Sequence, residues 1–192
     1  MKDDIEELVN KISQDLQILE DKLRHSEIEK VDIRFPRGYL RKASNFRKRL
    51  YFIKNETLKR NLAYHFMLSD VYRWILNRFD LSLTAKEMII KEGLALLGNI
   101  MAAIVKEITS KIDPNGNKHG VKASITVLVE REIITEELGK DLKWLWGVRC
   151  KEHIENLKDW EYQKYSLNDY NKAIKIWHAL EDQLNNACKR GN

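Results

Sequence analysis

The sequence predicts an all-α protein, an antiparallel bundle of about six to seven helices with no sheet. Glycine and proline are scarce, with 8 and 2 among 192 residues, so the tight turns that separate short strands are too few. Apolar residues recur every three or four positions along most of the chain, which is the spacing of one helix face. A hydrophobic content of 43% can build a real core, and the length fits one compact domain overall.

The N-terminal part, residues 1–53, is expected to hold an amphipathic helix and a basic helical segment. A helix from about residue 3 to 27 carries one apolar stripe, formed by Ile5, Val9, Ile12, Leu16, Leu19 and Leu23. A short two- or three-stranded coiled coil has the same spacing, so this helix is a candidate for assembly. Pro36 and Gly38 interrupt the pattern, and a short basic helix is expected from about 39 to 52.

The first long helices of the core, residues 54–192, are expected before and after residue 80. Asn55 can cap a helix from about 56 to 78, and Thr84 can cap one that runs to about 112. The second of these contains KEMIIKEGLALLGNIMAAIVKEI, which is apolar over nearly half its circumference. We therefore expect this helix to be the central, most buried element.

The C-terminal half is expected to add three helices after a loop. The DPNGNKHG segment combines two turn signals, so it predicts a loop. Helices are then expected at about 121–132, 135–158 and 167–188, with Thr135 and Asn168 as caps.

Positive charge is concentrated between Lys30 and Arg60, where eleven Lys and Arg residues accompany two acids. The candidate nucleic-acid contacts in this basic segment are Arg37, Arg41, Lys42, Arg47, Lys48 and Arg49. They alternate with aromatic residues, a mixture that attracts phosphates and stacks on unpaired bases. The alternative is a solvated helix face whose aromatic residues are core contacts.

Two Arg/His pairs qualify as parts of a metal-free phosphodiester-cleaving site. Arg60 and His65 point about 140° apart on a straight helix, so we interpret His65 as a buried, hydrogen-bonded histidine. Arg149 and His153 are only about 40° apart, within the apolar stripe of the helix at 135–158. A buried guanidinium requires an acid, a second subunit or an anionic ligand. A structural Arg bridged to a carboxylate and an exposed pair remain open beside the site interpretation.

At Arg149 the sequence also resembles a known family. The run ITEELGKDLKWLWGVRCKEHIENL and the segment after it are similar to the C-terminal half of HEPN domains (higher eukaryotes and prokaryotes nucleotide-binding), over about residues 84–188. The family has a Leu/Trp-rich helix that leads into an Arg, a polar spacer and a His. Here only three residues separate Arg149 from His153, and Cys150 stands where the family has Asn or Asp. RNLAYH at 60–65 has the family spacing but lies too early in the chain.

The resemblance implies a helical bundle that forms a symmetric homodimer and cuts single-stranded RNA without a metal. In that chemistry His153 would exchange a proton with the 2′-hydroxyl or the leaving oxygen, and Arg149 would hold the non-bridging oxygens. Asn156, one turn beyond, would orient the phosphate. A chain whose altered spacing disables this site would instead be a non-catalytic dimer that binds nucleic acid, a nucleotide or a protein partner, and a scaffold built on the first helix is a third interpretation.

The sequence also argues against several protein classes and predicts the partners and the location of the protein. The sequence lacks a phosphate-cradling Gly-rich loop, HExxH, a paired-carboxylate pattern and GxSxG, which argues against an NTPase, a zinc protease, a ferritin-like protein and an α/β-hydrolase. Two cysteines and five scattered histidines predict no metal site, and no cofactor is expected. We expect a cytoplasmic protein that binds nucleic acid, RNA rather than DNA, forms a homodimer and has no membrane span.

Overall fold

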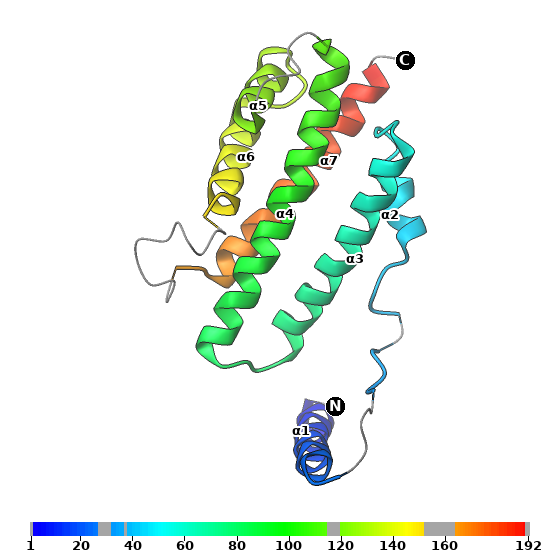
Figure 1. Ribbon diagram of the computed structural model, residues 1–192, viewed down its shortest axis with the longest axis vertical. Helices are drawn as coiled ribbons and strands as arrows, with labels where there is room; N and C mark the ends of the chain where they lie inside the picture. The colour runs from blue at the N-terminus through cyan, green and yellow to red at the C-terminus, as the bar shows by residue number, and fades with distance from the viewer. Residues whose placement is uncertain (1, 27–31, 37, 115–119, 152–163, 191–192) are drawn as a thin grey trace. The chain divides into compact units, whose positions relative to one another are not determined.

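The computed structural model describes residues 2–26, 32–36, 38–114, 120–151 and 164–190, and in them it contains seven helices and no strand (Figure 1). The helices are α1 (Lys2–Arg24), α2 (Ala43–Arg49), α3 (Glu56–Arg78), α4 (Leu83–Ile112), α5 (Val121–Glu130), α6 (Glu136–Arg149) and α7 (Leu167–Arg190). The predicted all-α class is confirmed. The chain divides into two compact units, Met1–Arg37 and Gly38–Asn192.

The first unit consists mainly of α1, an amphipathic helix without a buried residue. Its apolar stripe is exposed, with Ile5, Val9 and Ile12 at 58%, 54% and 50% of their full accessibility. The stripe residues are separated alternately by four and three positions, which is the heptad spacing of a coiled coil. This stripe is therefore apolar surface that α1 does not bury by itself.

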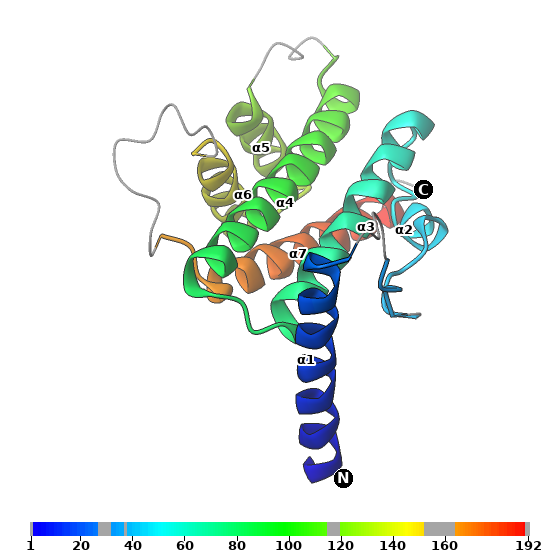
Figure 2. The ribbon, with the colours of Figure 1, turned by 60° about the horizontal axis from the view of Figure 1, so that its bottom comes forward.

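The second unit is a bundle around α4. In Figures 1 and 2, α5 and α6 lie on one side of α4, α3 on the other and α7 behind it, and α4 packs against all four. Leu94, Leu97 and Ile104 on α4 are completely buried, as its apolar sequence predicts. Contrary to the sequence analysis, the stretch Thr84–Ile112 is long and apolar enough to cross a membrane, and 72% of its most apolar 18-residue window is buried within the bundle.

The short helix α2 belongs to the bundle, so the unit boundary lies earlier than the break at residues 53 and 54 that the sequence suggested. Phe46 and Leu50 are buried, and the Phe46 ring stacks on Phe66 of α3 with 5.3 Å between the centroids. Ile53 in the following turn is also completely buried. The basic residues of α2 thus alternate with side chains that anchor this segment to α3.

Two of the four predicted caps form, and two positions differ. Asn55 Oδ1 accepts the backbone N–H of Leu58, and Thr135 Oγ1 accepts that of Leu138. The other two predicted caps, Thr84 and Asn168, lie inside α4 and α7, because these helices begin at Leu83 and Leu167. Before α7, Ser166 N donates to Asp169 Oδ2 while Asp169 N donates to Ser166 Oγ, the reciprocal arrangement of a capping box.

Two glycines in α4 allow other elements to approach its backbone. A Cβ atom on Gly98 would lie 2.7 Å from Cβ of Arg149 on α6, and one on Gly93 would lie 2.6 Å from Cε2 of Tyr170 on α7. Neither distance is compatible with an alanine unless the helices separate. Gly98 therefore determines how closely Arg149 sits against α4.

Candidate functional site

Arg149 is the last residue of α6, where the apolar face of this helix ends. Leu138, Leu142 and Leu145 on that face are buried, as predicted, and Arg149 is half-buried. The helix was expected to continue to residue 158, but α6 ends at Arg149 and Cys150 and Lys151 form a turn. The turn is closed by a hydrogen bond from Lys151 N to the carbonyl oxygen of Val148.

The guanidinium of Arg149 is held by neutral groups. Its Nε donates to Oδ1 of Asn99 on α4 at 2.7 Å, and its Cζ lies 5.1 Å from the centroid of the Trp146 ring. None of the ion pairs in the described parts of the chain includes Arg149. Asn99 therefore fixes the Nε edge of the Arg149 guanidinium. The two Nη groups of Arg149 keep N–H donors for an anion.

The other two residues of the predicted catalytic set, His153 and Asn156, lie outside the described residues. Their proximity to Arg149 stays a prediction of the sequence. Asn99 was missed, because it lies fifty positions earlier in the chain and belongs to no recognisable motif.

Two cations of the basic segment are engaged in internal ion pairs. Arg41 donates through its backbone N, Nε and Nη2 to the carboxylate of Asp70, at 3.1, 3.0 and 2.6 Å. Arg49 donates through Nε and Nη2 to both oxygens of Glu181. Asp70 and Glu181 are buried, so each needs this compensation, and the hydrogen bond to Glu181 raises the pKa of Arg49. Arg41 and Arg49 thus stabilise the fold by compensating two buried carboxylates.

Other cations of the segment are exposed and converge from two helices. Lys42 and Lys48 are exposed and Arg47 is half-buried, while Arg37 lies outside the described residues. A hydrogen bond from Lys59 holds the pKa of the Glu56 carboxyl below its ordinary value. The charges of Arg60 and Arg47 lower it further, so a cation from α2 and one from α3 lie near the same carboxylate. We call Lys42, Arg47, Lys48, Lys54 and Arg60 the α2–α3 basic surface.

Aromatic residues near this surface are divided between core and solvent. Phe46 and Phe52 are buried, as the core interpretation predicted, whereas Tyr51 is 45% exposed. Tyr64 on α3 is 55% exposed, and the sequence analysis missed it because it lies beyond the basic segment. Tyr51 and Tyr64 are therefore the aromatic rings available for stacking here.

His65 is exposed, and its interpretation as a buried histidine was wrong. Its Nδ1 donates to the carbonyl oxygen of Asn61, one turn earlier, at 2.8 Å. The buried residues of α3 include Leu62, Phe66 and Ser69, so the core lies to one side of His65. The hydrogen bond that was expected is local and needs no burial.

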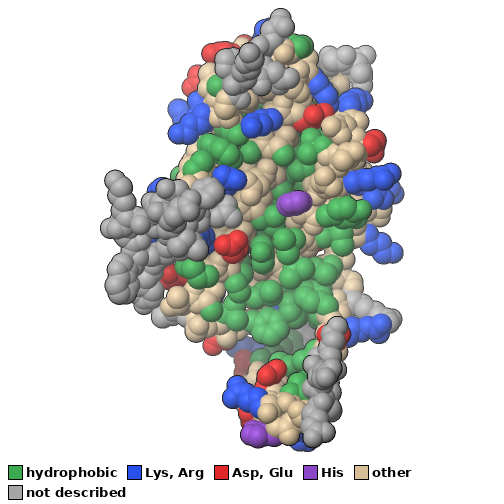
Figure 3. Space-filling view, in the orientation of Figure 1, with side chains coloured by type: hydrophobic (Ala, Val, Ile, Leu, Met, Phe, Trp, Pro, Cys, Tyr) green, Lys and Arg blue, Asp and Glu red, His purple; other side chains and the backbone are tan. Residues whose placement is uncertain are grey.

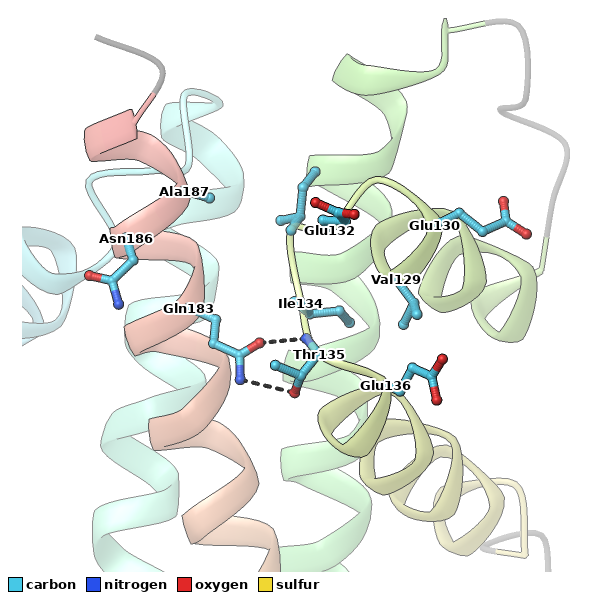
Figure 4. A pocket seen from close by; sticks show the side chains of 10 residues that line it. Val129, Glu130, Glu132, Ile134, Thr135, Glu136, Gln183, Asn186 and Ala187 are labelled. Carbon is cyan, nitrogen blue, oxygen red and sulfur yellow. Dashed lines mark hydrogen bonds between the residues drawn. The ribbon is translucent and has the colours of Figure 1, made fainter.

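A groove elsewhere on the bundle carries charge of the opposite sign. It has a volume of about 690 Å³ and lies between the α5–α6 turn and the C-terminal half of α7 (Figure 4). Glu130, Glu132 and Glu136 line it, and no Lys or Arg does. Gln183 Oε1 accepts from Thr135 N at 2.8 Å, and Gln183 Nε2 donates to Thr135 Oγ1 at 3.3 Å. Three carboxylates would repel a phosphate backbone, so this groove does not suit nucleic acid.

No protein-family model, curated protein or solved structure matches the chain. Two features of the described side chains suggest a function: the α2–α3 basic surface and the guanidinium of Arg149.

Proposed function

We propose that the protein binds single-stranded nucleic acid, RNA rather than DNA, through the α2–α3 basic surface. The observation that carries this proposal is that α2 packs against α3, which brings the exposed Lys42, Lys48, Lys54 and Arg60 and the half-buried Arg47 into one region of the bundle. No ion pair between described residues includes any of the five cations of this surface.

The surroundings of these cations also favour a single strand. Lys and Arg side chains gather on the side of the bundle where α2 and the start of α3 lie (Figure 3). Tyr51 and Tyr64 expose rings that can stack on unpaired bases, which are not accessible in a duplex. The exposed cations attract the phosphate backbone without reading its sequence, so binding should be weakly sequence-dependent.

The test is a salt titration of single-stranded RNA binding. The variant Arg47→Gln/Lys48→Gln/Arg60→Gln should bind more weakly than the wild type. Its plot of log affinity against log salt should be shallower by roughly 0.7 for each lost contact, or about 2 in all. Lys122→Gln/Lys140→Gln/Lys143→Gln removes the same charge from exposed positions on α5 and α6 and should leave the slope unchanged. Equal slopes for the two variants would contradict the proposal.

We propose metal-independent RNA cleavage at Arg149 as a second function. It is favoured by the half-buried guanidinium, which Asn99 and Trp146 hold without neutralising its charge. Such a group can stabilise the charge that builds on a phosphate during cleavage. His153 would serve as the proton-transfer group and Asn156 would orient the phosphate, as the HEPN resemblance implies.

Cleavage is tested with single-stranded RNA in excess chelator. His153→Ala and Arg149→Gln should abolish cleavage, and the wild type should remain active without divalent ions. Asn99→Ala should lower the rate with a smaller effect on RNA affinity, because it frees the guanidinium to rotate. His65→Ala is the control: its exposed ring should be dispensable for both cleavage and stability. Cleavage that persists in His153→Ala would contradict the assignment of His153 as the proton-transfer group, and a wild type that does not cleave would leave binding as the function.

We further propose that the protein self-associates as a homodimer through α1. The apolar residues 88–108 do not require a second copy of the chain, because four helices of the same bundle pack around α4. The exposed heptad stripe of α1 is the feature that supports assembly.

A further inference from the structure

A small polar pocket lies between α3 and α7, and no motif of the sequence points to it. It has a volume of about 170 Å³ and is lined by Arg73 and Asn77 from α3 and by Asn171 and His178 from α7. The walls between them are apolar, with Leu76 and Ile174 among them. An adjoining smaller cavity shares Arg73 and His178, so both residues face the same space. We call this the α3–α7 pocket.

Large aromatic side chains fill the space between α3 and α7 next to the pocket. The Phe66 and Trp177 rings are in contact, with 4.5 Å between their centroids. The hydroxyl of Tyr170 donates to the carbonyl oxygen of Ser69 at 3.3 Å. These contacts attach α7 to α3 on the core side, and Arg73 and His178 remain exposed.

The charge of the pocket is positive once the neighbouring ion pairs are considered. Asp70 lines the adjoining cavity, but its carboxylate is engaged by Arg41. Glu181 lies 3.8 Å from Nδ1 of His178, but both of its oxygens accept from Arg49. No ion pair in the described segments includes Arg73. The positive charge of Arg73 is therefore not compensated.

We propose that the α3–α7 pocket binds a phosphate group, as inorganic phosphate or as a small phosphate monoester. The guanidinium can donate two parallel hydrogen bonds to phosphate oxygens, and the imidazole and the two amide groups supply further donors. A volume of about 170 Å³ corresponds to about six water molecules at about 30 Å³ each, which leaves room for a phosphate and a few bonded atoms. This site goes beyond the proposed RNA binding, because it is built from other residues.

Calorimetric titration of the full chain with inorganic phosphate tests the site. Arg73→Gln should weaken phosphate binding at least tenfold, because it removes the only permanent charge of the pocket. Arg78→Gln lies on the same helix but does not line the pocket, so it should bind phosphate as the wild type does. Both side chains are exposed, and thermal unfolding should confirm that both variants fold.

Three ligands distinguish the sources of the phosphate. Glycerol phosphate that binds more tightly than inorganic phosphate would identify a monoester ligand, and equal affinities would identify the free ion. Glycerol alone should not bind. The proposal is wrong if neither phosphate nor glycerol phosphate binds at millimolar concentration, or if Arg78→Gln weakens binding as much as Arg73→Gln. The triple variant of the α2–α3 basic surface should keep full phosphate affinity, which separates this site from the proposed RNA surface.

Discussion

At the scale of single residues, Gly98 shows how one missing methyl group positions a functional side chain. Its backbone faces Cβ of Arg149, and the guanidinium beyond reaches Asn99, the next residue of α4. The close approach of α6 to Gly98 and the hydrogen bond between Arg149 and Asn99 are therefore linked. A wider gap between α4 and α6 would also move Nε of Arg149 away from Asn99.

Gly98→Ala should destabilise the protein although alanine favours a helix. The gain in helix propensity is about 1 kcal/mol, while the added Cβ would lie 2.7 Å from that of Arg149 and cost about 1–3 kcal/mol. Urea unfolding should thus report a net loss of about 1 kcal/mol. Gly147→Ala on α6 meets no atom within 4 Å and should instead raise stability by up to about 1 kcal/mol. The same sign for both variants would contradict this account.

Tyr170 predicts a loss of stability in alkaline solution. Burial raises the pKa of its hydroxyl, so the folded state keeps the proton at a pH where the unfolded chain, with an ordinary pKa of about 10, has lost it. Its stabilising contribution is complete below that pH and disappears as the pH rises through the folded value. Unfolding free energies measured between pH 8 and 11 should fall less steeply for Tyr170→Phe, which also loses about 1 kcal/mol with the bond to Ser69.

The sequence predicted the environments of some single residues but not their partners. The half-buried position of Arg149 follows from its place in a stripe with Leu142 and Leu145, because helix periodicity relates neighbours on one element. The contact of Arg149 with Asn99 depends on packing between distant elements, which periodicity does not encode. The same holds for the position of Arg73 and His178 around one pocket. His65 was misplaced because it lies at the edge of the α3 face that carries Leu62 and Ser69, where helix periodicity does not separate buried from exposed positions.

At the scale of elements, α1 is the helix whose amphipathic pattern has no partner within its own unit. The stripe places Val9, Leu16 and Leu23 at one heptad position and Ile5, Ile12 and Leu19 at the other. Most of the stability of a helix in a protein comes from the packing of its amphipathic face, so an isolated α1 would gain stability by pairing its stripe.

Ile12→Lys/Leu16→Lys should abolish self-association. These two charges lie in the middle of the stripe and would be buried in any helical pair. Asn10→Lys/Gln14→Lys adds the same charge to the opposite, polar side of α1 and should leave association intact. Light scattering at tens of micromolar measures both. A wild-type protein that is monomeric under these conditions would rule out the assembly.

The ends of the helices show where local sequence signals are enough to predict a boundary. α3 spans Glu56–Arg78 as expected, because Asn55 supplies a strong cap before a clear periodic pattern. α6 ends earlier than expected, since the polar residues after Arg149 are compatible with a helix and contain no glycine or proline to stop one. α2 is shorter than its basic pattern suggested, because Phe46 and Leu50 must reach the core and the chain then turns toward α3.

At the scale of the whole molecule, the two units should be separable. Removal of residues 1–37 should leave a folded bundle with nearly the same melting temperature, because every buried hydrophobic residue in the described parts of the chain lies in the second unit. The truncated protein should lose self-association and keep phosphate binding and RNA binding, whose cations lie after residue 37. Circular dichroism and light scattering would reveal a dependence of the bundle on α1.

The gross architecture was the most predictable property of the molecule. Scarce glycine and proline with helical periodicity identified the class, and the apolar run of α4 identified the central helix. The basic segment was identified as one patch, yet the structure divides it between ion pairs in the core and exposed cations. That division depends on Asp70 and Glu181, whose positions opposite Arg41 and Arg49 are set by the packing of α3 and α7.

The contact between Thr135 and Gln183 has a consequence for local opening of the bundle. The Thr135 hydroxyl accepts from Leu138 N at the start of α6 and from Gln183 of α7, whose amide oxygen also accepts Thr135 N. Unwinding the first turn of α6 therefore also breaks hydrogen bonds to α7, although Thr135 and Gln183 are 48 residues apart in the sequence. Amide hydrogens in the first turn of α6 should exchange with solvent more slowly than those of an ordinary helix end, and Gln183→Ala should accelerate them without changing the melting of α3.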